Sequence, residues 1–388
     1  MKISAHIFHS PIENESRLMK EASSLLKLKI VDKVLIFGLG KPNLDRFSIV
    51  NDKCVIYRSP IIKPPYFVSK VKLFNRITAV FNFFLFHSYI MFKVFSLKPT
   101  YISCHNLILL PLSKFCKVLT GAYLIYEPHE LETERTGLTG KLKIICKWIE
   151  KKFIYSADKI LTVCKPIEDW YCSNYNIDNV YTLRNVPVNP YLEDKLIKSN
   201  LLREVFNIPD EHIIFIYQGV LDPARGIVEL VNLFKSTTKN NHLVLMGYGS
   251  SVEWIVANSD VNIHFQQAVP VDKIIEYTSS ADLGIFFINN EVTLSYQWCL
   301  PNKFFEYLIA GLPVIVSDNL TYLSDIINEN QLGWSIPTNS NELKHLVNSI
   351  SKEDIKKIEN NVASYSKLNG WQIEESKLLD LYESFRLY

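Results

Sequence analysis

The residues best placed for chemistry in this chain are Asn302, Lys303 and Glu306. Pro301 and Asn302 are typical of a helix start, and we expect Asn302 to cap that helix. A helix start presents unpaired N–H groups and about half a positive charge, so it suits a phosphate, and Lys303 adds a full charge there. Glu306 follows Asn302 by four residues and therefore lies on the same face. This spacing fits a nucleotide diphosphate at the helix start, with its ribose hydroxyls at the Glu306 carboxylate.

The same pattern has a purely structural interpretation, in which Glu306 only complements the helix dipole. The residues that follow define the surrounding element. Gly311 is expected to end the helix in the left-handed conformation. Residues 314–316 are β-branched and apolar, which is typical of a strand buried on both faces. Residues 300–318 therefore predict a helix, a tight turn and a parallel strand.

Two glycines and an arginine follow other predicted strands of the second half. Residues 213–217 predict a buried strand, and Gly219 after it permits close approach of the backbone to a ligand. Arg225 can donate two parallel hydrogen bonds to a diphosphate, although a solvated turn arginine is the alternative. Residues 242–246 predict another strand, followed by a glycine turn that contains Gly249.

Polar residues also follow two predicted strands of the first half. His105 and Asn106 come after residues 101–103, and His129 comes after residues 123–126. In parallel sheets, ligands bind beyond the carboxyl ends of the strands. We therefore expect these side chains at a ligand-binding cleft, while a structural role is the alternative for a lone histidine such as His129.

Size and composition are those of a soluble globular protein with two or three domains. The chain has 388 residues, of which 48% are hydrophobic and 21% charged. Residues 1–190 contain 27 Lys and Arg against 15 Asp and Glu, whereas the rest contains 15 against 25. The basic first half predicts an anionic partner. Arg17, in the first predicted helix, is a candidate for binding an anionic acceptor, although a solvated helix arginine is commoner.

The cysteines and the N-terminal residues predict a cytoplasmic protein. The seven cysteines show no CxxC pair and no spacing with histidine that is typical of zinc, so we interpret them as free thiols. Residues 1–10 lack the charged start, apolar run and cleavage site of a signal peptide. We expect no metal, no cofactor and no nucleic-acid partner.

Residues 77–92 (ITAVFNFFLFHSYIMF) have the most unusual composition. The run is rich in aromatic residues and has sixteen residues, fewer than the 18 or more expected of a membrane span. A segment lying on an anionic membrane is one interpretation, and a core helix under the first sheet is the other. Each nearby basic residue contributes on the order of 1 kcal/mol at such a surface. These residues are Lys63, Lys70, Lys72, Arg76 and Lys93.

Together with these segments, the run PNKFFEYLIAGLPVI resembles the donor-binding half of retaining GT-B glycosyltransferases, the group that includes lipopolysaccharide and capsule enzymes. The resemblance spans nearly the whole chain. It implies that Glu306 holds the ribose of a nucleotide sugar. It also implies that His129, in the segment YEPHE, contacts the reacting sugar region or the acceptor. Glu130 is then a candidate for orienting the His129 imidazole.

The chain departs from the family pattern at two positions. Val220 stands where the family often has an arginine, so Arg225 is expected to bear more of the leaving-group charge. Trp298 stands where many relatives have a sugar-binding glutamate. The sugar of the donor must then be held by other residues, and the candidates are Glu291, Ser295 and Tyr296.

We therefore expect an α/β protein of two facing, doubly wound Rossmann-like domains. They comprise residues 1–190 with a returning helix at 370–388, and residues 193–369. The expected activity is retaining transfer of a sugar from a nucleotide diphosphate sugar to a lipid-linked or cell-surface glycan acceptor, at the inner face of the cytoplasmic membrane. Two alternatives stay open: a non-catalytic subunit that binds sugar nucleotides, and a sugar nucleotide epimerase. Three residues are expected to act in catalysis: His129, Arg225 and Lys303.

Overall fold

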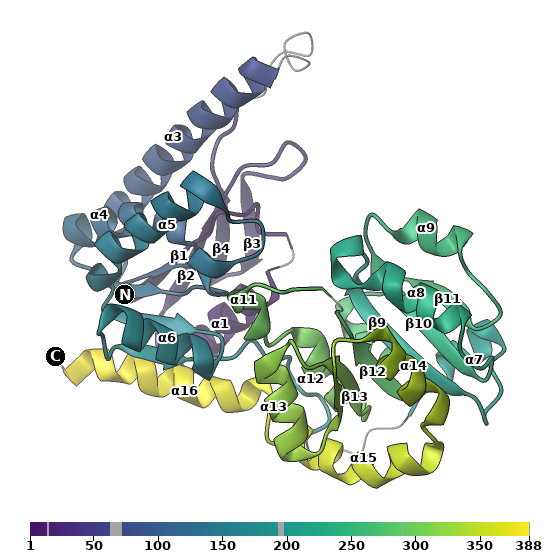
Figure 1. Cartoon of the computed structure of the whole chain (residues 1–388). Helices are drawn as coiled ribbons and strands as arrows, with labels where there is room; N and C mark the ends of the chain where they lie inside the picture. Colours follow the sequence, from purple (N-terminus) through teal and green to yellow (C-terminus); the bar gives the residue numbers. More distant parts are fainter. Residues whose placement is uncertain (14, 63–71, 193–197, 289, 388) are drawn as a thin grey trace. The chain divides into compact units, whose positions relative to one another are not determined.

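Two units, each built on its own β-sheet, make up the chain (Figure 1). The computed structural model describes residues 1–13, 15–62, 72–192, 198–288 and 290–387. The first unit contains residues 1–184 and 375–388, and the second contains residues 185–374. The predicted boundary at residue 190 falls within the second unit, and residue 193, the predicted start of the second domain, lies outside the described residues.

The first unit contains an eight-stranded sheet in the order β3-β4-β2-β1-β5-β6-β7-β8. Neighbouring strands are parallel, except that β3 and β4 form an antiparallel pair at one edge. The strands before the predicted polar residues, β5 and β6, lie side by side next to β1. The strands are β1 (Ile3–Ile7), β2 (Lys33–Gly38), β3 (Phe47–Asn51), β4 (Cys54–Arg58), β5 (Tyr101–Cys104), β6 (Tyr123–Tyr126), β7 (Lys159–Thr162) and β8 (Val180–Thr182).

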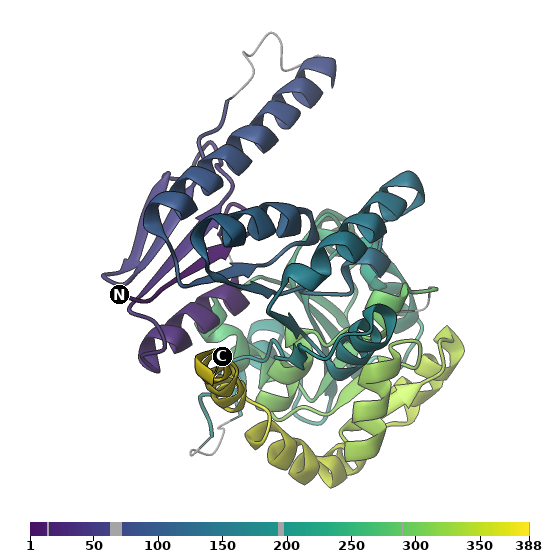
Figure 2. The same cartoon turned by 90° about the vertical axis from the view of Figure 1, so that its left-hand side faces the viewer.

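Helices α1 (Ser16–Lys27) and α16 (Trp371–Glu383) pack on one face of this sheet (Figures 1 and 2). The Ser24 hydroxyl of α1 donates a 2.8 Å hydrogen bond to Glu375 at the beginning of the returning segment. Tyr382 of α16 packs edge-on against Tyr101 of β5, with ring centres 4.9 Å apart. The first unit is therefore completed by a helix that follows the second unit in the sequence.

Four helices cover the opposite face of the first sheet, and the carboxylate of Glu150 connects two of them. Glu150 is buried and accepts hydrogen bonds from Tyr126 of β6 (3.2 Å) and from Tyr171 of α6 (2.7 Å). Along this face α3 lies next to α4, and α4 next to α5. The helices are α3 (Lys72–Leu97), α4 (Leu110–Thr120), α5 (Gly140–Phe153) and α6 (Lys165–Tyr175).

Helix α3 is a surface helix, so the prediction of a core helix in this region is wrong. A narrow stripe of Phe86, Ile90 and Val94, at most 1% exposed, packs against the unit. The other large apolar side chains of the helix are mostly exposed, for example Phe84 (63%) and Phe92 (67%). Figure 2 shows α3 running outward from the body of the first unit.

The predicted sixteen-residue apolar run is part of this longer helix. Phe74–Leu97 has 24 residues and a mean hydropathy of 1.4, and by length and composition it is long enough to cross a membrane. Of the basic residues predicted around it, Arg76 is exposed, and the ammonium of Lys93 lies 5.0 Å from the ring centre of Tyr57. Lys63 and Lys70 lie outside the described residues.

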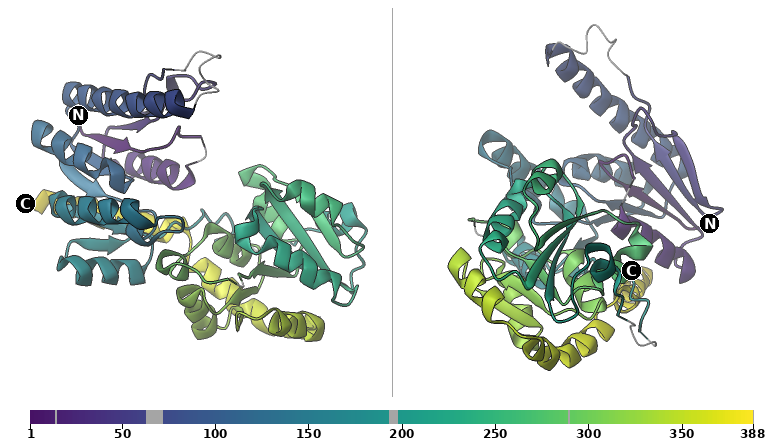
Figure 3. Two further views of the ribbon diagram at one scale, coloured as in Figure 1. Left: turned by 45° about the horizontal axis from the view of Figure 1, so that its top comes forward. Right: turned by 90° about the vertical axis from the view of Figure 1, so that its right-hand side faces the viewer.

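The second unit contains a six-stranded, parallel sheet in the order β11-β10-β9-β12-β13-β14 (Figure 3). The strand order changes direction between β9 and β12, and such points are where doubly wound sheets bind ligands. The predicted strand at 314–316 is fully buried, as its apolar sequence indicates. The strands are β9 (Ile213–Val220), β10 (Asn241–Tyr248), β11 (Ile263–Gln267), β12 (Leu283–Phe286), β13 (Val314–Ser317) and β14 (Gly333–Ile336).

The helix predicted from the motif, α12 (Asn302–Ile309), is held close to β12 by a glycine. A Cβ atom at Gly284 would lie 2.4 Å from the ring of Tyr307 in α12, so this strand position has no room for a side chain. Gly311 has φ +77° and follows the helix, as predicted. The other helices are α7 (Leu201–Phe206), α8 (Ile227–Lys235), α9 (Val252–Ala257), α10 (Ile274–Thr278), α11 (Leu294–Gln297), α13 (Thr321–Asn330), α14 (Ser340–Ser349) and α15 (Lys352–Lys367).

Candidate functional site

Helix α12 begins one residue earlier than predicted, and Asn302 does not cap it. Pro301 occupies the N-cap position with an extended backbone (ψ 147°), and Asn302 is the first helical residue. Its Oδ1 atom is buried and has no hydrogen-bond partner among the described residues. Buried polar atoms in proteins are usually hydrogen-bonded, so this oxygen is free to bind a ligand at the helix start.

Lys303 lies between two aromatic rings at the carboxyl ends of β9 and β12. Its Nζ atom is 3.8 Å from the ring centre of Tyr217 and 4.7 Å from that of Phe286. Burial, and then the nearby charge of Arg225, lowers the pKa of Lys303 to about 7. The two aromatic rings favour the charged form of Lys303, whereas burial disfavours it. A bound anion would therefore favour the protonated, charged form of Lys303.

Gly219 leaves open the space above the Lys303 ammonium. It has φ +116°, and a Cβ atom there would lie 3.6 Å from the Nζ atom of Lys303. Any larger side chain would extend over this cation. The predicted close approach of a ligand to the Gly219 backbone and the predicted charge of Lys303 therefore occur at the same place.

Arg225 is held at this site by Tyr296, which sequence analysis proposed as a sugar-binding residue. The guanidinium donates a 2.6 Å hydrogen bond to the Tyr296 hydroxyl, and its central carbon lies 5.5 Å from that ring's centre. The charge of Arg225 contributes to the lowered pKa of Lys303, so the two cations share one electrostatic environment.

Glu306 is oriented by a residue that sequence reasoning missed. The side-chain amide of Gln218 donates a 2.5 Å hydrogen bond to Glu306 and accepts a 2.6 Å bond from Thr278. The Gln218 backbone N–H donates to the Tyr307 hydroxyl at 3.1 Å. The sequence signal for this role is a glutamine directly before Gly219 at the end of a predicted strand. Gln218 fixes the carboxylate that the resemblance assigns to the ribose.

Gly249 and Ser295, which were also predicted to bind the donor, lie in the second unit but are closely packed. Gly249 has φ +154°, and a Cβ atom there would lie 2.4 Å from the carbonyl oxygen of Leu221, so it packs on backbone. Ser295 of α11 is only 3% exposed. Neither residue has the open position that Gly219 provides.

Arg17, predicted to bind an acceptor, is instead buried inside the first unit. Its side chain is 3% exposed and pairs with Glu21 at 2.6 Å. It also donates to the carbonyl of Leu183 at 2.9 Å and lies 3.7 Å from Glu127. The prediction of a surface arginine is wrong, because two buried carboxyl groups hold the guanidinium in the interior. It therefore has no direct access to an acceptor.

His105 is also buried, and it contacts the predicted catalytic histidine. It is fully buried, and its Nδ1 atom lies 3.0 Å from Nε2 of His129. On the other side of the ring, Nε2 lies 3.0 Å from Nδ1 of His6. His105 is thus the residue that orients His129, the role for which Glu130 was considered. Direct binding of an acceptor by His105 is excluded by its burial.

His129 lies beyond the carboxyl end of β6 and is partly exposed. Its ring packs edge-on against Phe8, with ring centres 5.2 Å apart. Burial, and then the charge of Arg17, lowers the pKa of His129 to about 3. The imidazole is therefore neutral at physiological pH.

Four buried side chains beside this histidine are close enough together to hold a metal ion: His6, Glu21, His105 and Glu127. The Arg17 guanidinium already supplies a positive charge beside two of these side chains, Glu21 and Glu127. The facing nitrogens of His6 and His105 are 3.0 Å apart, which is a hydrogen-bond distance. Burial, and then the charge of Glu127, raises the pKa of Glu21 to about 8, so Glu21 holds a proton at neutral pH.

The sequence of the second unit matches a known family. Residues 226–371 match the family model of the C-terminal domain of glucosyltransferase 3-like proteins. This match covers less than half of the chain, so it shows a resemblance of the second unit to that glucosyltransferase domain. No curated protein matches it in sequence.

Solved structures similar to this chain share its fold over nearly the whole length. A sucrose-phosphate synthase from Thermosynechococcus elongatus is 16% identical, with a TM-score of 0.75 and 100% of both chains covered. HepE from Anabaena, in complex with UDP-glucose, is 10% identical, with a TM-score of 0.72 and 99% and 100% covered. WaaG, a glycosyltransferase involved in lipopolysaccharide biosynthesis, is 12% identical, with a TM-score of 0.65 and 97% and 98% covered. The predicted two-domain, Rossmann-like GT-B fold is confirmed.

Asn106, predicted to bind an acceptor, connects two loops at the carboxyl ends of the first sheet. Its Oδ1 atom accepts a 2.7 Å hydrogen bond from the backbone N–H of His9, which follows β1. The side chain is partly exposed. It therefore stabilises the loop arrangement around β1 and β5.

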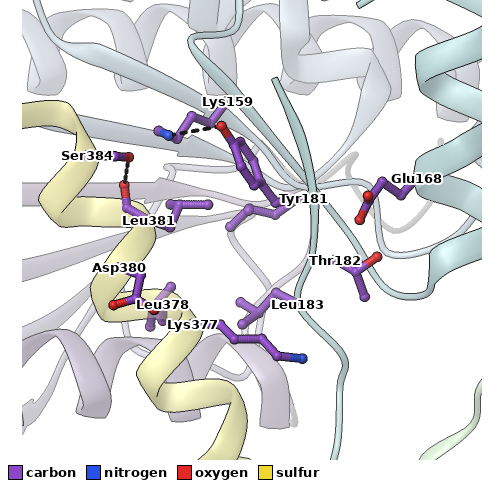
Figure 4. A pocket seen from close by; sticks show the side chains of 11 residues that line it. Lys159, Glu168, Tyr181, Thr182, Leu183, Lys377, Leu378, Asp380, Leu381 and Ser384 are labelled. Carbon is purple, nitrogen blue, oxygen red and sulfur yellow. Dashed lines mark hydrogen bonds between the residues drawn. The ribbon is translucent and has the colours of Figure 1, made fainter. Parts of the chain in front are cut away.

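A cavity of about 380 Å³ lies elsewhere in the first unit (Figure 4). It is bounded by strands β7 and β8 and by α16, and its lining includes Lys159, Tyr181 and Lys377. The Lys159 ammonium lies 4.5 Å from the centre of the Tyr181 ring. None of the residues around Lys303 or His129 lines this cavity, so it is separate from the candidate site.

Proposed function

We propose that this enzyme transfers a sugar, with retention at the anomeric carbon, from a nucleotide diphosphate sugar to a lipid-linked or cell-surface glycan acceptor. Such a reaction belongs to the biosynthesis of a polysaccharide, a lipopolysaccharide or a capsule. The observation that carries the proposal is the grouping of Lys303, Arg225 and Glu306 around the N-terminus of α12.

The sugar-donor half of the reaction needs a site for a departing diphosphate. Lys303 and Arg225 supply two cations there, and the first turn of α12 supplies backbone N–H groups. These groups act where negative charge develops as the glycosidic bond breaks. The Glu306 carboxylate, held by Gln218, can accept hydrogen bonds from the ribose hydroxyls.

The acceptor half of the reaction is assigned to the carboxyl edge of the first sheet, where His129 is partly exposed. Retention requires no protein nucleophile if the leaving phosphate takes the proton of the acceptor hydroxyl. His129, which is neutral because of its low pKa, then contributes a hydrogen bond rather than a charge. No cofactor or metal ion is needed in this scheme, because Lys303, Arg225 and the helix end neutralise the diphosphate.

A membrane-bound acceptor is supported by the apolar and basic surface of α3, α4 and α5. Exposed aromatic side chains on it include Phe84 of α3, Phe115 of α4 and Trp148 of α5, which is 57% exposed. Exposed lysines of α5, for example Lys141 and Lys151, stand beside them. Aromatic and basic side chains together favour the interface of an anionic membrane. We therefore propose peripheral attachment to the inner face of the cytoplasmic membrane.

The similar structures support the choice of substrate class. HepE binds UDP-glucose in its crystal structure, and WaaG is involved in lipopolysaccharide biosynthesis. A UDP- or GDP-sugar is accordingly the first donor to test.

The test combines binding with turnover. Affinities of the purified enzyme for UDP- and GDP-sugars are measured by calorimetry, and donor consumption is then followed with and without lipid-linked oligosaccharide. We expect consumption only with acceptor, and NMR of the product should show the anomeric configuration of the donor. Lys303→Met should strongly weaken binding, whereas Lys357→Met, at an exposed lysine of α15, should not.

Three results would contradict the proposal, and each points elsewhere. Binding without turnover for every acceptor would indicate a non-catalytic subunit. Isomerisation of the sugar nucleotide without acceptor would indicate an epimerase. An inverted product would exclude the retaining mechanism.

A further inference from the structure

Three histidines of the first unit form a hydrogen-bonded row across its sheet, which we call the histidine row: His6, His105 and His129. Adjacent rings are joined by nitrogen–nitrogen contacts of 3.0 Å. The strand register explains the arrangement. His6 of β1 is opposite Ser103 of β5, two residues before His105. Each step across the sheet thus moves toward the carboxyl ends of the strands, and the row reaches the surface at His129.

The contacts within the histidine row couple the proton positions of all three rings. A neutral imidazole carries one N–H, so two arrangements satisfy both contacts: all protons on Nδ1, or all on Nε2. In the first, the Ser4 hydroxyl donates to Nε2 of His6, 3.2 Å away, and His129 carries its proton on Nδ1. In the second, Nδ1 of His129 carries no proton. No described residue hydrogen-bonds this Nδ1 atom, which is therefore available to substrate.

Glu127 favours the first arrangement. Its Oε2 atom lies 3.8 Å from Nδ1 of His105 and 3.7 Å from the Arg17 guanidinium. This oxygen is buried and has no hydrogen-bond partner among the described residues. A carboxylate oxygen attracts the positive end of an N–H dipole, so it favours a proton on Nδ1 of His105. His105 then donates to Nε2 of His129, and the proton of His129 must be on Nδ1.

The other carboxyl group beside the row, that of Glu21, is neutral. Its pKa is raised to about 8, first by burial and then by Glu127, so Glu21 holds a proton at neutral pH. The Arg17 guanidinium and the Glu127 carboxyl group also face the row.

We propose that His105 and Glu127 are positioning residues that hold His129 as a neutral imidazole whose Nδ1–H donates a hydrogen bond to an oxygen atom of the bound acceptor. The inference rests on the proposed function, because the acceptor is the partner of that hydrogen bond. His6 and Ser4 extend the row inward and satisfy the remaining nitrogens.

The proton positions can be measured directly in the full-length protein. Nitrogen-15 NMR of the imidazole rings distinguishes Nδ1–H from Nε2–H, and His129→Asn assigns the His129 signals. We expect Nδ1–H at both His105 and His129 from about pH 5.5 to pH 8. Glu127→Gln should produce a mixture of tautomers. A proton on Nε2 of His129, or a wild-type spectrum that Glu127→Gln does not alter, would overturn the proposal.

A double-mutant cycle tests whether His105 acts through His129. Asparagine at position 129 places an amide N–H near the former Nδ1–H but cannot join the row. We expect His105→Gln to lower kcat roughly tenfold in the wild-type background and less than about twofold in the His129→Asn background. Equal losses in both backgrounds would mean that His105 has only a structural role. If His105→Gln does not fold, the NMR measurement on the wild type and on Glu127→Gln decides.

The second unit offers a matched control. His212, His242 and His264 form a similar row, with nitrogen–nitrogen contacts of 2.9 Å, at the amino ends of β9, β10 and β11. His242→Gln should lower the thermal stability and leave kcat unchanged. A loss of kcat as large as that of His105→Gln would contradict a specific role for His105.

Two further measurements separate this proposal from others. Elemental analysis of the wild-type protein should show no stoichiometric metal. A metal ion that is present in the wild type and lost in His105→Gln would overturn the hydrogen-bonded row. If no sugar nucleotide is turned over, the proposed function fails. The tautomers measured by NMR would then still decide whether the row holds His129 as described.

Discussion

The ammonium of Lys303 lies 3.8 Å from the centre of the Tyr217 ring. Phe286 is on another side, at 4.7 Å. Aromatic faces attract a cation but do not neutralise it as a carboxylate would. The charge of Lys303 is therefore stabilised only in part, and it remains able to bind a diphosphate.

Affinity for a sugar nucleotide should fall as the pH rises above 7. The pKa of Lys303 is lowered to about 7, so the free enzyme carries the charge below this pH and loses it above. Binding of the anionic diphosphate at higher pH requires uptake of one proton. We expect the Kd to rise by up to about tenfold per pH unit above 7, with proton uptake visible by calorimetry in buffers of different ionisation enthalpy.

The control for this prediction is Lys303→Met, which should bind weakly at every pH. A pH-independent affinity of the wild type between about pH 6 and 9 would mean that Lys303 does not change its protonation on binding.

Glu306→Ala should weaken nucleotide binding without unfolding the protein. Hydrogen bonds to a charged group are worth about 1.5–3 kcal/mol, so we expect a loss of affinity of roughly 10- to 100-fold. Calorimetry measures the affinity, and a thermal melt checks the fold. Glu329→Ala, at an exposed glutamate of α13, is the matched control and should leave affinity unchanged. Unaltered binding by Glu306→Ala would exclude the ribose contact.

Gly219→Ala should reduce both stability and donor affinity. Position 219 has φ +116°, which costs about 1–3 kcal/mol for an alanine, and the added methyl group would lie over Lys303. Gly121→Ala, at φ +72° with no atom within 4 Å of the new Cβ, controls for backbone strain alone. A nucleotide affinity that falls equally in both variants would show that the space over Lys303 is unimportant.

Phe84→Ser and Phe92→Ser should each weaken binding to anionic vesicles by roughly tenfold. Burial of one phenylalanine contributes about 1.5–3 kcal/mol, and both side chains are more than half exposed in the protein. Val271→Ser, at a residue of the second unit that is 79% exposed, is the control. Sedimentation with phosphatidylglycerol vesicles gives the measurement. Resistance of membrane-bound protein to high salt and alkaline carbonate would indicate a spanning α3 rather than peripheral attachment.

The second histidine row should make the second unit sensitive to acid. Burial lowers the pKa of both His242 and His264 to about 4, from 6.5 in the unfolded chain. Their contribution to stability is therefore complete above pH 6.5 and is lost as the pH falls toward 4. We expect a loss of up to about 2 kcal/mol per histidine, allowing for solvent screening.

Thermal melts between about pH 7 and 4.5 measure this effect. His345→Gln, at an exposed histidine of α14, should show the wild-type pH dependence. In His242→Gln, thermal stability should depend less steeply on pH. An unchanged pH dependence in this variant would mean that the row stays neutral for another reason.

Local patterns in the sequence were sufficient to predict the elements around the sugar-donor site. The apolar run at 314–316 and Gly311 define a strand and a helix end that depend on neighbouring residues alone. Gly219 follows a predicted strand, so its close approach to a ligand could be predicted without a structure.

The burial of Arg17 and His105 could not be predicted in this way. Both are enclosed by partners far away in the sequence, such as Leu183 for Arg17 and His129 for His105. The role of Gln218 was missed for the same reason, since its partners Thr278 and Glu306 come from other elements. The local sequence predicts helices and strands well. It predicts less well which polar side chains face the interior.

Helix α16 also has a consequence for how the protein is synthesised and folds. Tyr382 and Phe385 cover Tyr101 of the first sheet, yet a ribosome synthesises them only after the entire second unit. The nascent first sheet therefore waits with apolar surface uncovered while the intervening residues emerge. Maturation of the amino-terminal half is completed by the residues translated last, and until then that half is a natural client for chaperones.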